Sequence, residues 1–194
     1  MARRKLRSQD EVVERCRALQ QEVRAAYERN GGAASDPRVV DVLWRGEALG
    51  ALLWALGLVD LPPYDTPFSA AETLAARTDE AELRPPDEID GEREAARLWH
   101  WRARTSELAT DGALELGWRY ASVDQLVAAT AMRGHEEGVL PPPVRGDFPA
   151  FGKTYRHLTP LELAEAHSIA AERHHALNWL CGLGQSWDDV PLDT

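Results

Sequence analysis

The chain has 194 residues, of which 44% are hydrophobic and 28% charged, and its formal net charge is −10. This length favours one domain, over 1–194, that buries a core of its own. The negative charge disfavours nucleic acid as a partner, because phosphate binding relies on a clustered Lys/Arg surface.

Start and stop signals predict three helices in the first half of the chain. Ser8-Gln9-Asp10-Glu11 is a capping box that opens a first helix within residues 1–35, and Asn30-Gly31-Gly32 stops it. Asp36-Pro37 supplies an N-cap with proline at the first helical position, and Gly57 ends this second helix. Ser69-Ala70-Ala71-Glu72 is another capping box, which opens a short third helix.

The second half predicts three more helices. Pro85-Pro86-Asp87-Glu88 starts a long helix that runs to about Ala109, and Ser122 caps another from Val123 to about Arg133. The strongest start is Thr159-Pro160-Leu161-Glu162, and Gly182 closes that last helix. The expected fold class is therefore all-α: a compact multi-helix bundle, with at most a short β-ribbon near 144–155.

Three features predict a cytoplasmic protein that does not enter a membrane. Cys16 and Cys181 stand alone, without Cys-x-x-Cys spacing, which favours reduced thiols. The basic start of the chain is followed by no apolar run, so we expect no signal peptide. The longest apolar stretch, Val39 to Leu58, contains Asp41, Arg45 and Glu47, as in a buried helix rather than a membrane span.

Acidic residues and histidines gather at the end of the last predicted helix, Pro160 to Cys181. Glu172 and His175 are one turn apart and can face a single ion. Carboxylate-bridged metal bundles need a second Glu-x-x-His, which the sequence lacks, so we expect no metal and no other cofactor. Glu172, His175 and Asp188 remain the candidate catalytic residues of a hydrolase-like enzyme, with or without a divalent metal.

The same helix carries the residue types of a cysteine-protease triad, at His174, Asn178 and Cys181. Seven residues rise about 10 Å along a helix, too far for a His–Cys hydrogen bond. Cys181 also lies at a helix C-terminus, where the dipole disfavours the thiolate. We interpret Cys181 as a small core residue.

Glu47 is expected to be partly buried, because it shares its helical stripe with Leu43, Gly50 and Trp54. A buried carboxylate needs a partner. Our candidate is Arg173, which would give a cross-helix ion pair that fixes the register of the second and last helices.

A cationic stripe marks the long helix, where Arg93, Arg97, His100 and Arg104 fall at i, i+4, i+7 and i+11. Such a stripe is solvated, pairs with acidic neighbours such as Glu92, Glu94 and Glu107, or binds an anionic ligand or an acidic partner protein. After Gly182, the binding candidates Trp187 and Asp189 belong to an acidic tail. Its indole either pins the terminus, or Asp188 and Asp189 present carboxylates beside the His174/His175 turn.

Several of these segments resemble the bacterial family called domain of unknown function 4272. The most specific segment is Glu172 to Leu180 with Trp187-Asp188-Asp189 and Asp193-Thr194. The others are Trp44 to Leu49 with Leu53 to Gly57, then Arg84, Glu88, Ile89, Glu92, His100, Trp101 and Arg104, and lastly Phe148 to Leu158. The resemblance spans 36–194 and departs at Arg97-Leu98, where Tyr-Arg is expected. It implies a bacterial origin, a helical fold and a single domain, but no catalytic residues, since the family has no established activity.

Two functions remain open. The first is a non-catalytic module that binds a protein partner, in the manner of bacterial immunity or regulatory proteins. The absence of a complete catalytic constellation from the sequence favours it. The second is the hydrolase-like enzyme that uses Glu172, His175 and Asp188. The sequence leaves the oligomeric state open.

Overall fold

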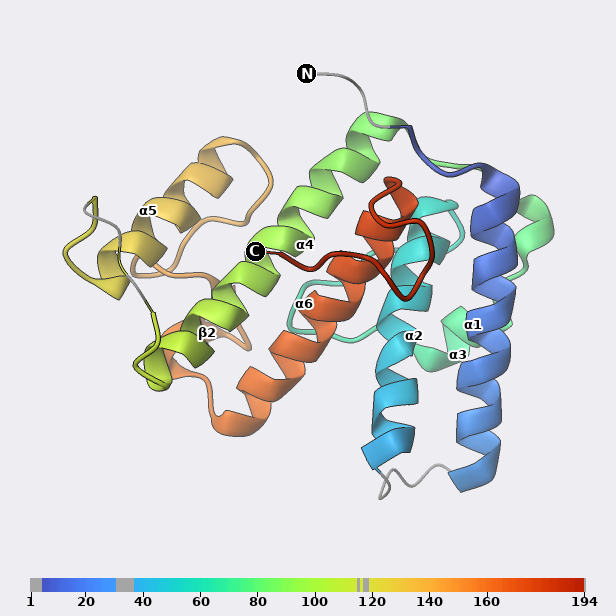
Figure 1. The fold of residues 1–194 in the computed structure, drawn as a ribbon, viewed down its shortest axis with the longest axis horizontal. Helices are drawn as coiled ribbons and strands as arrows, with labels where there is room; N and C mark the ends of the chain where they lie inside the picture. Colours follow the sequence, from blue (N-terminus) through green and yellow to red (C-terminus); the bar gives the residue numbers. More distant parts are fainter. Residues whose placement is uncertain (1–4, 31–36, 115, 117–118, 194) are drawn as a thin grey trace.

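The computed structural model describes residues 5–30, 37–114, 116 and 119–193, with the side chains of residues 30 and 37–41 left aside. The described part of the chain is mainly helical (Figure 1). The α-helices are α1 (Gln9–Asn30), α2 (Pro37–Ala55), α3 (Ala70–Ala75), α4 (Pro86–Thr110), α5 (Val123–Glu136) and α6 (Pro160–Leu180). Two single 3₁₀ turns, η1 (Thr78–Glu80) and η2 (Tyr155–His157), lie in the connections. The predicted all-α fold class is confirmed.

The helices begin where their capping residues predict. Thr159 and Glu162 form a reciprocal capping box at the start of α6, and Ser8 and Glu11 do the same for α1. The hydroxyl of Ser122 caps α5. The expected stop at Gly31-Gly32 and the expected N-cap at Asp36 lie outside the described residues.

Glycine closes α2 and α6. Gly57 has φ of +70° and its N–H donates to the carbonyl of Trp54 at 2.9 Å, while Gly182 has φ of +73° and donates to that of Trp179 at 3.0 Å. Left-handed backbone strains any residue with a Cβ, so both positions favour glycine. The predicted ends of both helices are thus confirmed.

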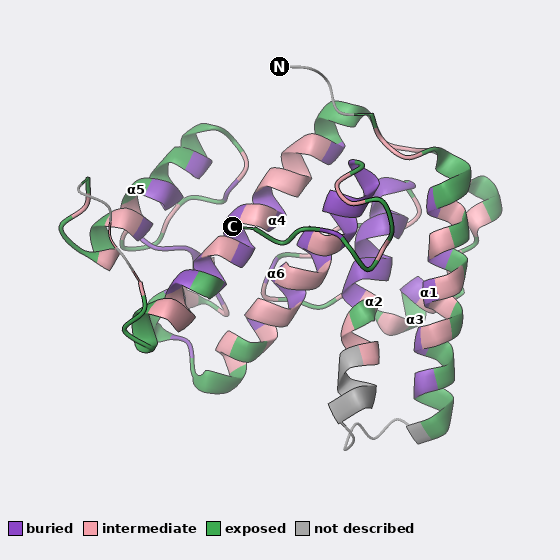
Figure 2. Ribbon diagram, in the orientation of Figure 1, coloured by how far each residue is buried: buried purple, intermediate pink, exposed green. Residues whose placement is uncertain are grey.

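Four long helices lie in a row in the order α1, α2, α6, α4 (Figure 1). The short α3 packs against α1 and α2, and α5 packs on α4 at the other end of the row. Buried residues follow the facing sides of α2, α4 and α6 (Figure 2). Since α6 has neighbours on both sides, its second half from Ala176 to Leu180 is buried all round.

A β-hairpin confirms the short ribbon predicted near 144–155. Strand β1 (Pro149–Ala150) pairs antiparallel with β2 (Lys153–Thr154). Phe151 and Gly152 between them both have positive φ, at +51° and +72°, as a two-residue turn of the I′ type requires. Among the described residues, no helix has the length and apolarity needed to cross a membrane.

Candidate functional site

A buried ion pair joins the middle of α2 to α6. Nε and Nη2 of Arg173 donate to Oε2 of Glu47 at 3.0 and 2.9 Å. The other N–H groups of Arg173 donate to backbone carbonyls of residues 62, 63 and 66. The guanidinium lies over the rings of Tyr64 and Phe68. The structure thus brings together the two residues that the sequence paired, and it uses all of the donors of Arg173 internally.

Phe68 completes the environment of Glu47. Its backbone N–H donates to Oε1 of Glu47 at 2.8 Å, and its ring lies where a Cβ on Gly50 would stand, 2.2 Å from Cγ. Burial raises the pKa of Glu47, and the charge of Arg173 opposes this rise. The residue at position 50 must therefore be small for Phe68 to cover the ion pair.

Two histidines meet in the interface between α4 and α6. Nδ1 of His100 lies 3.1 Å from Nδ1 of His174. The side-chain amide of Asn178 donates to Nε2 of His174 and to the carbonyl of Pro191, each at 2.9 Å. Since Asn178 donates to both, Nε2 of His174 is an acceptor, and its proton lies on Nδ1, facing His100.

Both imidazoles are neutral at pH 7. Burial lowers the pKa of His100 to about 4, helped by repulsion from His167 and Arg104. Burial likewise lowers the pKa of His174 to about 3, helped by repulsion from His100 and Arg93. A second proton on His174 would point at the amide of Asn178, which is itself a donor. The pair therefore acts as a hydrogen-bonded part of the core.

A cleft of about 370 Å³ opens between the last turns of α4 and the first turns of α6. Its polar wall includes Glu107 and His167, both partly exposed, with Oε1 of Glu107 2.5 Å from Nδ1 of His167. The other carboxylate oxygen accepts from Arg104. The ring of His167 stacks on His100, with 5.5 Å between centroids. The Glu107–His167 pair was not predicted, although His167 precedes His174 by two turns on the same helix face, a spacing that indicates a shared polar stripe.

The floor of this cleft includes Tyr155, which is 1% exposed. Its hydroxyl has no hydrogen-bond partner among the described residues. The guanidinium of Arg102 lies over the Tyr155 ring. Buried hydroxyls normally have a hydrogen-bond partner, so the Tyr155 hydroxyl is free to bond a group that enters the cleft.

Arg102 is held by a buried carboxylate from the loop before β1. Asp147 accepts from Nε and Nη2 of Arg102 at 2.8 and 3.0 Å, and from the backbone and side chain of Arg156. Burial would raise the pKa of Asp147, but its bonds and charge attraction to Arg102 outweigh burial and lower it. Sequence reasoning missed this pair because Asp147 lies in a loop with no periodicity.

The three candidate catalytic residues lie in the second half of α6 and in the segment after it, and the charge of Asp188 acts on His175. Nε2 of His175 lies 2.9 Å from the backbone carbonyl of Trp187, and the imidazole packs edge-on against the indole. Burial lowers the pKa of His175. Asp188 is exposed, and Glu172 is half-buried and engaged in contacts of its own. Within the described residues, no group of three or more His, Cys, Asp or Glu side chains is placed to hold a metal ion.

The predicted cationic stripe is paired or buried for most of its length. Arg97 donates to both oxygens of Glu94, at 2.9 and 2.6 Å, and Arg104 pairs with Glu107. His100 is buried against His174. Arg93 lies 4.0 Å from Asp90, and its Nε has no hydrogen-bond partner in the described part of the chain.

The segment after α6 folds back onto the bundle. Trp187 packs against Trp179, with 5.4 Å between ring centroids, and the guanidinium of Arg15 lies 4.8 Å above it. Asp189 accepts from the backbone N–H groups of residues 185 and 186, which lowers its pKa. The structure therefore places Trp187 and Asp189 in contacts that anchor this segment.

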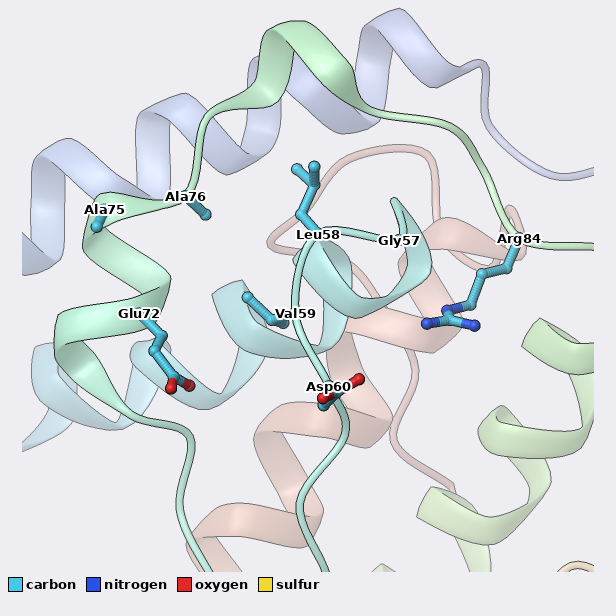
Figure 3. A pocket seen from close by; sticks show the side chains of 8 residues that line it. All are labelled: Gly57, Leu58, Val59, Asp60, Glu72, Ala75, Ala76 and Arg84. Atoms are coloured by element: carbon cyan, nitrogen blue, oxygen red, sulfur yellow. The ribbon is translucent and has the colours of Figure 1, made fainter.

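A second cavity, of about 460 Å³, lies where α2, α3 and the start of α4 meet (Figure 3). In this view Glu72 lies on one side, Arg84 on the other, and Asp60 between them (Figure 3). Both carboxylates are exposed, and Arg84 donates to the carbonyl of Trp54 at 2.7 Å, which closes the end of α2. These contacts favour a solvated hollow with a structural arginine.

Residues 29–116 match the family model described as domain of unknown function (DUF4272). The match confirms the resemblance for this part of the chain, which includes the motifs at Trp44 to Gly57 and Arg84 to Arg104. It does not extend to the motifs of α6 and the following segment. No curated protein and no solved structure matches the chain.

Proposed function

We propose that the chain is a non-catalytic protein-binding module of the bacterial cytoplasm, in the manner of immunity or regulatory proteins. Leu161, in the first turn of α6, carries the proposal, because its side chain is 78% exposed. Single exposed leucines are common on protein surfaces. Leu161 differs in its position, one turn before Ala164, which lines the cleft between α4 and α6. An exposed apolar residue next to an apolar-walled hollow is typical of a docking surface.

The hydrogen bonds and ion pairs of the buried polar side chains support the same proposal. His100, His174 and Arg173 are bonded within the core. A catalytic group needs a free functional atom within reach of a substrate. Nε2 of His175 is engaged by a backbone carbonyl, so the hydrolase-like alternative with Glu172 and Asp188 has less support. Binding through a surface needs no such atom.

The test compares two leucine-to-aspartate variants in capture from a lysate of the source cells. Leu161→Asp should abolish retention of a stoichiometric partner, because a carboxylate cannot replace a buried apolar contact. Its stability should not change, since an acidic residue is favourable in the first turn of a helix. The matched control is Leu192→Asp, in the C-terminal segment, where leucine is 37% exposed; it should retain the partner. Equal retention by both variants, or no partner with the wild-type chain, contradicts the proposal.

A further inference from the structure

The cleft between α4 and α6 is lined by both apolar and polar groups. The apolar wall consists of Ala103, Leu163, Ala164 and the ring of Tyr155. The polar part includes two acidic residues, Glu107 and Asp111, and two hydroxyl residues, Ser106 and Thr110. Its volume of about 370 Å³ exceeds that of any single side chain. The acidic groups favour a cation, and the apolar wall favours an aliphatic stem next to it.

The hydroxyl groups of the cleft can accept hydrogen bonds from such a cation. The Tyr155 hydroxyl has no partner in the described part of the chain. Burial raises the pKa of Tyr155, so this group stays protonated and can both donate and accept. The Thr110 hydroxyl donates its proton to the carbonyl of Ser106 at 2.9 Å, which leaves its lone pairs for another donor.

The contacts of Glu107 favour an ammonium over a guanidinium at this carboxylate. One oxygen accepts from His167 and the other from Arg104. A guanidinium prefers a carboxylate that offers both oxygens at once, and Glu107 cannot do so. An ammonium is a compact charge with three donors on a flexible four-carbon stem, and it can use single acceptors placed around it.

We propose that the cleft between α4 and α6 receives a lysine side chain from the protein partner. The stem lies along Ala103, Leu163 and Ala164, and the ammonium reaches the Tyr155 hydroxyl and the acidic rim. Leu161 then contacts an apolar residue next to that lysine. This inference rests on the proposed function, since it names the chemistry of the partner that the module binds.

The test uses a small probe, so that it does not depend on isolating the partner. Nα-acetyl-lysine methylamide is titrated into the ¹⁵N-labelled chain of residues 1–194. Nα-acetyl-norleucine methylamide, which keeps the stem but lacks the ammonium, serves as the matched probe. The lysine probe should shift the backbone amides of Ala103, Ser106, Thr110, Leu163 and His167, with a Kd at least about tenfold lower than that of the norleucine probe. Equal effects of the two probes, or no shift with either, overturn the inference.

Variants locate the site and separate the inference from the proposed function. Tyr155→Phe removes only the hydroxyl and should weaken the lysine probe about threefold or more, and Asp111→Asn should do the same by removing the rim charge. Tyr27→Phe, at an exposed tyrosine of α1, is the control and should leave binding unchanged. If Leu161→Asp abolishes partner binding while Tyr155→Phe and Asp111→Asn affect neither probe nor partner, the inference fails and the proposed function stands. If the probe behaves as expected and Leu161→Asp retains the partner, the proposed function fails instead.

Discussion

Two carboxylates that pair with side chains of α6 show opposite uses of the same chemistry. Glu47 and Arg173 are buried between α2 and α6, and all of their polar contacts are made within the protein. Glu107 and His167 lie between α4 and α6 with side chains 39% and 31% exposed, at the rim of a cleft. A buried pair fixes the packing of helices at a high desolvation cost. A half-exposed pair adds little to stability, and it keeps its charge where another molecule can reach it.

The difference follows from what covers each pair. Phe68 closes over Glu47 because Gly50 gives it room on α2. Glu107 stays 39% exposed at its cleft, where Tyr155 forms part of the lining. The same helix therefore serves packing on one side and, on our proposal, binding on the other.

The largest expected effect is at the buried pair. Arg173→Met should lower the free energy of unfolding by about 3 to 5 kcal/mol, because it leaves Glu47 buried without a cation. The double variant Glu47→Met, Arg173→Met should lose much less than the sum of the two single variants, since no buried charge remains. Urea unfolding measures all three, with Arg77→Met, in an exposed pair with Asp79, as a control that should leave the free energy of unfolding unchanged. A loss below 1 kcal/mol for Arg173→Met contradicts the structural role.

The second effect depends on pH and concerns His100 and His174. Their pKa values in the folded chain, about 4 and about 3, lie below the ordinary value of 6.5. Below about pH 6.5 the two histidines are therefore protonated in the unfolded chain but neutral in the folded chain. The stability present above pH 6.5 is lost as the pH falls toward 4. We expect a loss of about 4 kcal/mol between pH 7 and pH 5, about half from each imidazole, measured by urea unfolding.

His174→Gln separates this pair from the other titrating groups. With one of the two imidazoles removed, the loss of stability between pH 7 and pH 5 should fall to roughly half. His135→Gln, at an exposed position on α5, is the matched control and should keep the pH dependence of the wild type. An unchanged dependence in His174→Gln shows that other groups cause it.

The buried pair could be predicted from sequence, whereas the cleft could not. The stripe of Glu47 with Leu43, Gly50 and Trp54 indicates a buried carboxylate, and helix periodicity alone is enough to see it. Helix starts are similarly local, since Thr159 and Glu162 carry their own signal. His167 carries a weaker one through its spacing to His174.

The contacts around the cleft could not be predicted, because they depend on the path that a loop takes. Asp147 and Tyr155 belong to the connection between α5 and α6, whose path brings them to Arg102 on α4. No spacing in the sequence predicts these contacts with Arg102, because loops lack a fixed period. The cationic stripe shows the converse. Its residues have the spacing of one helix face, but Arg97 and Arg104 pair with neighbouring glutamates and His100 is buried against His174.

The smallest stability effect is expected at the open pair, and it separates the two uses most sharply. Glu107→Gln keeps the shape of the side chain and removes its charge. Stability should change by less than about 1 kcal/mol, since the side chain is 39% exposed and water replaces much of what is lost. Glu47→Gln is the matched substitution at the buried pair and should cost several times more. Binding of the lysine probe should fall in Glu107→Gln and stay unchanged in Glu47→Gln. Similar losses of stability in the two variants would show that Glu107 is a second structural carboxylate rather than part of a docking site.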